Sequence, residues 1–96
     1  MIQKATREQT RTQNRQLVLK TIYQREPISR AQIARATRLT RPTVSDVVTE
    51  LMSRQLVHEV GYGPSTGGKP PMLLSIDPDA RHIVAVDLSR SDFRGA

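Results

Sequence analysis

Two short helices separated by a tight turn are predicted within residues 28–57, and this arrangement constrains the fold more than any other feature of the chain. Ser29 and Gln32 have the spacing of a capping box, in which each side chain binds the other residue's backbone N–H. A helix is therefore expected from about residue 30 to residue 36. Leu39 follows in the turn and should point inward between the two helices.

The second helix of this pair has an apolar back and a small, polar, basic front. Thr40 is a favourable N-cap, and Pro42 falls in the first turn, where its missing N–H costs nothing. The apolar stripe has the period of an α-helix and consists of Val44, Val47, Val48 and Leu51. Such a front fits the major groove of DNA, which admits one helix and is read near the helix N-terminus. An ordinary helical hairpin in a small core is the alternative reading of this pattern.

Composition restricts the classes of function. Ninety-six residues with 36% apolar and 3% aromatic side chains make one small domain with a modest aliphatic core. Such a chain has no room for a deep catalytic cleft, so no enzymatic activity, catalytic residue or cofactor is expected. The absence of cysteine excludes disulfides and thiolate metal sites, and no metal site is expected. No membrane span or signal peptide is recognisable. With a helix suited to DNA, the expected location is cytoplasmic and nucleoid-associated.

Charge is unevenly distributed along the chain. Residues 1–54 carry eleven Lys or Arg and four Asp or Glu, a net charge of +7. Residues 55–96 carry four Lys or Arg and five Asp or Glu, a net charge of −1. A basic half of this kind favours a polyanionic partner, with a solvated surface as the alternative.

The remaining segments complete a three-helix unit with a wing. A helix is expected over residues 14–24 and should end at Glu26-Pro27, because the residue before a proline avoids the helical region. Strands are expected over residues 56–60 and 72–76, on either side of a long Gly/Pro loop. The predicted fold is α+β and mainly α, a three-helix winged helix-turn-helix with a two-stranded β wing.

Four motifs stand in this order along the chain: Ile28-Ser29-Arg30-Ala31, Leu39-Thr40-Arg41-Pro42-Thr43-Val44-Ser45, Gly67-Gly68-Lys69-Pro70-Pro71 and Leu73-Leu74. Together they resemble the N-terminal winged-helix domain of ROK-family repressors, over about residues 13 to 88. The helix-turn-helix part is shared with many winged-helix regulators. The Gly-Gly-Lys-Pro-Pro segment makes the resemblance to the ROK family more specific. The resemblance implies a sugar-responsive repressor that binds double-stranded DNA at an inverted-repeat operator, as a homodimer in the full-length protein.

The resemblance also implies three regions. In ROK proteins a sugar-kinase-like domain follows, whose first strand resembles residues 83–88, with Asp87 at the position of the phosphate-loop aspartate. The glycine-rich turn of that domain is replaced by Leu88-Ser89-Arg90, and the sugar-effector site is absent from this chain. The expected regions are a polar basic arm or the start of the first helix at residues 1–12, the winged helix-turn-helix domain at residues 13–77, and a linker with the first strand of a truncated sugar-kinase-like domain at residues 78–96.

The side chains expected to contact DNA form three groups. The base-reading group lies on the second helix of the pair and consists of Arg41, Pro42, Thr43, Ser45, Asp46 and Thr49. The phosphate-contacting group consists of Ser29, Arg30, Arg35, Arg38 and Thr40. The minor-groove group of the wing, a basic side chain on an extended and unbulky segment, consists of Gly67, Gly68, Lys69 and Pro70.

Some assignments leave an alternative open. Arg41 either pairs with guanine O6 and N7 or clamps a phosphate at the helix start. Asp46 is repelled by phosphates unless it accepts from cytosine N4 or orients a neighbour. Lys69 lies in a minor-groove hook or in a flexible linker, and these two interpretations are compatible. His58 and His82 have no partners at metal-ligand spacing. For the whole chain, the alternatives to DNA binding are a winged-helix protein-interaction module and a fragment of a ROK sugar kinase.

Overall fold

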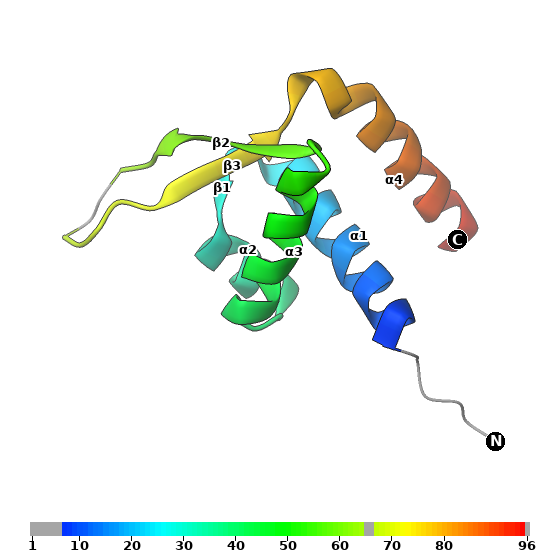
Figure 1. The fold of residues 1–96 in the computed structure, drawn as a ribbon, viewed down its shortest axis with the longest axis horizontal. Coiled ribbons are helices and arrows are strands. Elements are labelled where there is room, and N and C mark those ends of the chain that lie inside the picture. The colour runs from blue at the N-terminus through cyan, green and yellow to red at the C-terminus, as the bar shows by residue number, and fades with distance from the viewer. Residues whose placement is uncertain (1–6, 65–66, 96) are drawn as a thin grey trace.

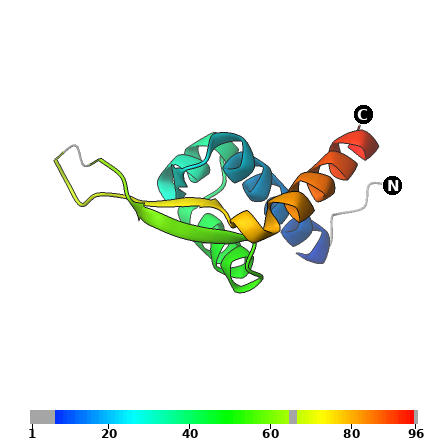
Figure 2. The ribbon, with the colours of Figure 1, turned by 90° about the horizontal axis from the view of Figure 1, so that it is seen from above.

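The computed structural model describes residues 7–64 and 67–95, and it contains four α-helices and a three-stranded antiparallel sheet (Figure 1). Helices α1 to α3 pack together beneath the sheet, and α4 lies along α1 at the end opposite the wing (Figures 1 and 2). The elements are α1 Arg7–Arg25, β1 Ile28–Ser29, α2 Arg30–Thr37, α3 Arg41–Ser53, β2 Val57–Tyr62, β3 Met72–Ile76, the short 3-10 turn η1 Pro78–Ala80 and α4 Arg81–Gly95.

Helices α2 and α3 begin at the caps that the sequence predicts. The Ser29 hydroxyl accepts from the Gln32 N–H at 3.2 Å, and the Ser29 N–H donates to the Gln32 side chain at 3.0 Å. The Thr40 hydroxyl accepts from the Thr43 N–H at 3.3 Å. Arg38 ends α2 in the left-handed conformation, with φ of 62°, which turns the chain sharply into α3. The predicted helix-turn-helix is therefore confirmed.

The core is aliphatic, as the composition predicts. The predicted stripe of α3 is buried, and Leu39 packs against the core from the turn between the helices. The side chains with less than 2% exposure are Val18, Ile22, Ile33, Val44, Val48, Leu51, Leu74, Ile76 and Val84. Full burial of one such side chain stabilises the fold by roughly 1.5–3 kcal/mol, so this cluster fixes α3 against the rest of the domain.

Strands β2 and β3 form the predicted two-stranded wing. Val57 pairs with Ile76 at its base and Tyr62 with Met72 farther out, and a bulge interrupts the ladder just before Gly61. Gly61 has φ of 127°, a conformation that side chains with a Cβ rarely adopt. The wing projects away from the helices (Figure 2).

Strand β1 was not predicted. Its two residues, Ile28 and Ser29, pair with Leu74 and Leu73 of β3, so the sheet has three strands in the order β1-β3-β2. Because this strand is defined only by its pairing with β3, no local sequence pattern predicts it. The strand ties the start of α2 to the base of the wing.

Helix α1 is longer than predicted. It begins at Arg7, so residues 7–12 of the expected arm belong to the helix, and residues 1–6 lie outside the described residues. The helix ends at Arg25, directly before Glu26-Pro27, as the sequence predicts.

The strand predicted at residues 83–88 is wrong, because this segment lies within helix α4. Val84 and Leu88, one helical turn apart, are buried against the rest of the core, while Ile83 and Val86 remain exposed. Asp87 accepts a hydrogen bond from Gln16 of α1 at 2.7 Å. The short apolar run at residues 83–86 fits a strand or a helix equally well, and here the packing on α1 selects the helix. The domain boundary at residue 78 stays a prediction.

Glu26 joins three elements at the base of the sheet. Its carboxylate accepts hydrogen bonds from the Ser75 hydroxyl, from the Ile76 N–H at 2.9 Å and from Arg81 at 2.7 Å. Burial by itself raises the pKa of Glu26, but these hydrogen bonds and the charge of Arg81 outweigh burial and lower the pKa below its ordinary value. The ionised carboxylate therefore holds the end of α1, β3 and the start of α4 together.

Candidate nucleic-acid interface

The predicted base-reading residues lie on the side of α3 that faces away from the core. Arg41, Pro42, Asp46 and Thr49 are exposed, and the side chains of Thr43 and Ser45 are half-buried at the flanks of the helix. The structure therefore brings these residues together on one helical face. Whether they touch bases stays a prediction.

The N-terminus of α3 favours an anion. Its first turn contains no acidic residue, and the helix dipole places partial positive charge at this end. Arg38 and Arg41 stand on either side of the Thr40 cap and are exposed. Thr40 also donates to the Thr43 hydroxyl at 2.9 Å, which fixes both side chains at the helix start.

The arginines divide into two sets. In the first set, Arg15 and Arg54 bind the Glu50 carboxylate at 2.7 and 2.9 Å, with Arg11 at 3.6 Å. Arg30 pairs with Glu59 and Arg81 with Glu26. The second set has no ion pair with any residue that the structure describes, and consists of Arg7, Arg25, Arg35, Arg38, Arg41 and Arg90. Three glutamates thus neutralise arginines that join elements, and three of the unpaired arginines, Arg35, Arg38 and Arg41, lie on the helix-turn-helix.

Two predicted phosphate contacts have structural roles. Ser29 is 5% exposed and its hydroxyl accepts the Gln32 N–H at the cap of α2, so it lies beneath the exposed face of the candidate interface. Arg30 lies 3.6 Å from the Glu59 carboxylate of β2 and 3.8 Å from the Met52 sulfur of α3. It therefore braces α2 against the wing and α3. The remaining members of the group, Arg35, Arg38 and Thr40, are exposed.

The predicted minor-groove group lies at the far end of the wing. All four residues, Gly67, Gly68, Lys69 and Pro70, are exposed. Gly67 has φ of 102°, which a residue with a Cβ rarely adopts. The wing holds this segment well away from the body of the domain (Figure 1).

Tyr62 is a surface residue that the sequence reading did not single out. It stands 65% exposed at the outer end of β2, with Val60 48% exposed nearby. The signal available in the sequence was an aromatic residue between Gly61 and Gly63 in a chain with few aromatics.

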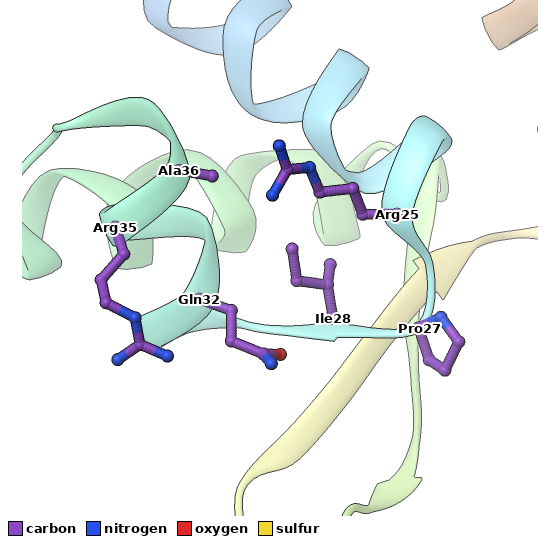
Figure 3. A pocket seen from close by; sticks show the side chains of 6 residues that line it. All are labelled: Arg25, Pro27, Ile28, Gln32, Arg35 and Ala36. Atoms are coloured by element: carbon purple, nitrogen blue, oxygen red, sulfur yellow. The ribbon is translucent and has the colours of Figure 1, made fainter.

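A cavity of about 430 Å³ lies between the end of α1, β1 and α2 (Figure 3). Arg25 extends from α1 over Ile28 toward Ala36, whereas the Arg35 side chain extends from α2 in a different direction, away from the Arg25 guanidinium (Figure 3). The Gln32 amide between them is engaged in the capping box. The two guanidinium groups do not converge, so the cavity is not built for a small anion.

The histidines lie apart from each other, His58 on β2 and His82 on α4. Within the described parts of the chain, no group of three or more His, Asp or Glu is placed to hold a metal ion. Nor does any described helix combine the length and the apolar character that crossing a membrane requires.

Comparisons with known proteins agree with this architecture. The family model described as MarR family matches residues 12–59. The xylose repressor of Caldicellulosiruptor bescii is 43% identical over 75 residues, which are 78% of this chain and 19% of that protein. The DNA-binding transcriptional dual regulator NagC of Escherichia coli K12 is 34% identical over 79 residues, 82% of this chain and 20% of that protein.

Among solved structures, a ROK-family transcriptional regulator, a homologue of the Escherichia coli Mlc protein, superposes with a TM-score of 0.57 at 26% identity. The match covers 71% of this chain and 17% of that one. The chain spans about a fifth of the length of the curated relatives it matches. The chain therefore belongs to the MarR family of winged-helix proteins, and its winged helix is similar to that of a ROK-family transcriptional regulator.

Proposed function

We propose that this chain is the double-stranded DNA-binding module of a transcriptional regulator, and that the regulator is a sugar-responsive repressor. The observation that carries the proposal is the start of α3, where an acid-free first turn is flanked by Arg38 and Arg41, neither of which has an ion pair with a described residue. The relatives support the class of function, since their names describe a xylose repressor and a DNA-binding regulator. The response to a sugar would reside in the part of such proteins that this chain does not span.

In the proposed mechanism, exposed basic residues dock on phosphates and α3 reads the bases. Arg35 and Arg38 release counterions from the backbone and set the position of the domain. Arg41, at the start of α3, forms a bidentate pair with a guanine in the major groove, worth roughly 1–3 kcal/mol of discrimination. Thr43, Ser45, Asp46 and Thr49 contact neighbouring bases.

The wing contributes a second contact in this mechanism. Lys69 enters an adjacent minor groove that is narrow and A·T-rich, where the negative potential is enhanced. Two copies of the domain bind an inverted repeat with half-site centres roughly 34–36 Å apart. The homodimer forms in the full-length protein, which acts in the cytoplasm at the nucleoid and has no enzymatic activity. Residues 78–96 lead into the following domain.

One selection tests the proposal. The chain is immobilised, incubated with random duplex DNA, and the retained duplexes are sequenced after several rounds. A common motif among the retained duplexes, with affinity that falls steeply as salt rises, is the expected result. Retention of duplexes without a shared motif, or weak binding that is flat with salt, would instead point to a protein-interaction module.

A further inference from the structure

A groove runs between the first half of α1 and the reading helix α3. Its volume is about 730 Å³, and it is lined by Arg7, Arg11 and Asn14 from α1 and by Thr43, Asp46 and Thr49 from α3, among others. Both helices begin at the same end of the molecule (Figure 1). The exposed first turns of α1 therefore flank the residues proposed to read bases.

Arginines line both this groove and the hollow beside it. A second hollow of about 470 Å³ shares Arg7 and Arg11 with the groove, and its charged lining comprises four arginines and two glutamates. Glu50 is already bound by Arg15 at 2.7 Å and by Arg54 at 2.9 Å. The groove itself is lined by two arginines and two acids, since Asp46 and Glu50 face Arg7 and Arg11. Over the groove and the adjoining hollow together, the four arginines exceed the three acids Glu8, Asp46 and Glu50 by one charge.

Arg11 forms a long and exposed ion pair with Glu50 that can be exchanged for another anion. Its guanidinium lies 3.6 Å from Glu50, and its side chain is 68% exposed, whereas Arg15 is 24% exposed. An exposed ion pair of this kind contributes little to stability, so Arg11 leaves Glu50 at small cost. Glu50 keeps its two closer partners when this happens. Arg7, one helical turn earlier, has no ion pair within the described residues.

The dimensions of B-DNA indicate that one strand of the duplex would lie at the groove between α1 and α3. The major groove is about 12 Å wide, and an α-helix with its side chains is about 10–12 Å in diameter. A helix seated in the major groove of DNA therefore brings a neighbouring helix against the phosphates that line the edges of the major groove. Helix α1 packs beside α3, so its first turns meet one of these walls.

We propose that the backbone of one DNA strand lies along this α1–α3 groove and is contacted by Arg7 and Arg11, with Arg11 moving from Glu50 to a phosphate. This inference rests on the proposed function and adds α1 to an interface otherwise made by the helix-turn-helix and the wing. The contact is to phosphate and carries no sequence information, so it adds affinity and fixes the depth at which α3 enters the major groove.

The test measures the affinity of the whole chain for a selected duplex and for an unrelated duplex over a series of salt concentrations. The variants are Arg7→Gln and Arg11→Gln, with Arg90→Gln, an exposed arginine on α4, as the control of equal charge change. Each α1 variant should weaken both duplexes by the same several-fold factor. The slope of log affinity against log salt should become less steep by about 0.9 for each lost phosphate contact. Arg11→Lys should restore the slope, because lysine also binds phosphate.

The outcomes separate the two proposals. If the unaltered chain shows no salt-dependent DNA binding, the proposed function fails and this inference fails with it. If the unaltered chain binds but the slopes for Arg7→Gln and Arg11→Gln equal that for Arg90→Gln, only the α1 contact is overturned. Circular dichroism of each variant checks that the helices are intact, so that a lost contact is distinguished from a lost fold.

Discussion

Arg15 of α1 donates to the Glu50 carboxylate of α3 at 2.7 Å, and each of these side chains is less than a quarter exposed. This contact links the first helix to the helix that we propose to read DNA. Glu50 lies on the flank of α3 next to α1 and also binds Arg54 on its own helix. The orientation of α3 therefore depends on a partly buried carboxylate as well as on the aliphatic core.

Glu50→Gln should lower the free energy of unfolding by about 1–2 kcal/mol, because a charged acceptor shared by two arginines is replaced with a neutral amide. Urea denaturation monitored by circular dichroism measures the change. Glu59→Gln is the matched control, since the Glu59 side chain is 42% exposed and its Arg30 partner lies 3.6 Å away. The control should lose less than about 0.5 kcal/mol. Equal losses in the two variants would contradict the assigned role of Glu50.

Arg41→Ala should relax the preference for one base pair, whereas Arg35→Ala should weaken all sequences alike. The physical reason is that a bidentate contact to a guanine edge discriminates by roughly 1–3 kcal/mol, while a phosphate contact does not discriminate. Selection from random duplex DNA with each variant measures both effects. If Arg41→Ala leaves the selected motif unchanged and only lowers affinity, Arg41 clamps a phosphate.

Asp46→Asn should raise the affinity for duplexes of unrelated sequence by roughly two- to fivefold, because an exposed carboxylate without an ion pair among the described residues is repelled by phosphates. Titration of a labelled unrelated duplex at low salt measures the gain. Thr49→Ala, a change on the same exposed face that leaves the net charge unaltered, serves as the comparison. Unchanged or weaker binding by Asp46→Asn would show that this carboxylate does not face the backbone.

Lys69→Ala should weaken binding most when the sequence beside the selected motif is A·T-rich. The narrow minor groove of such sequences attracts an inserted basic side chain more strongly than the wider groove of G·C-rich sequences. Competition between duplexes that differ only in these flanks measures the preference. If Lys69→Ala lowers the affinity by the same factor for duplexes with A·T-rich and with G·C-rich flanks, Lys69 makes only a general phosphate contact.

Glu26 predicts a pH dependence of stability. Its pKa is lowered in the folded chain, so its contribution is present above the unfolded pKa of about 4.3 and is lost as pH falls through the folded value. Glu26→Gln should therefore be less stable than the unaltered chain at pH 7 by about 1–3 kcal/mol, because Ser75, Ile76 and Arg81 lose their charged acceptor. The difference should shrink when urea denaturation is repeated near pH 3. A difference that is the same at both pH values would contradict the proposed brace.

Local chemistry explains which elements the sequence predicts well. Helices α2 and α3 were expected nearly at their observed bounds because Ser29, Gln32, Thr40 and Pro42 are start signals that act within a few residues. Strand β1 depends on pairing with β3 some 45 residues away, and no short-range pattern encodes that pairing. The prediction of a strand at residues 83–88, within α4, was wrong for a different reason. Residues 83–86 form a short apolar run that fits either structure, and only the burial of Val84 and Leu88 in the core selects the helix.

The candidate site divides in the same way. The exposed face of α3 follows from helical periodicity, so Arg41, Asp46 and Thr49 were placed correctly on the solvent side. The capping role of Ser29 was visible in the sequence, but its burial depends on the pairing with β3. The role of Arg30 depends on its contact with Glu59, and the sequence alone revealed neither of these tertiary contacts. Arg11 was not among the predicted contacts but joins the candidate site, because it lies beside α3 only when α1 and α3 are packed together.

The most direct measurement is a structure of this chain bound to a duplex obtained by selection. The account predicts that the first turns of α3 lie in the major groove, with Arg41 or its neighbours within about 2.7–3.2 Å of base-edge atoms. An α3 that lies outside the duplex, with no side chain touching a base, would contradict it.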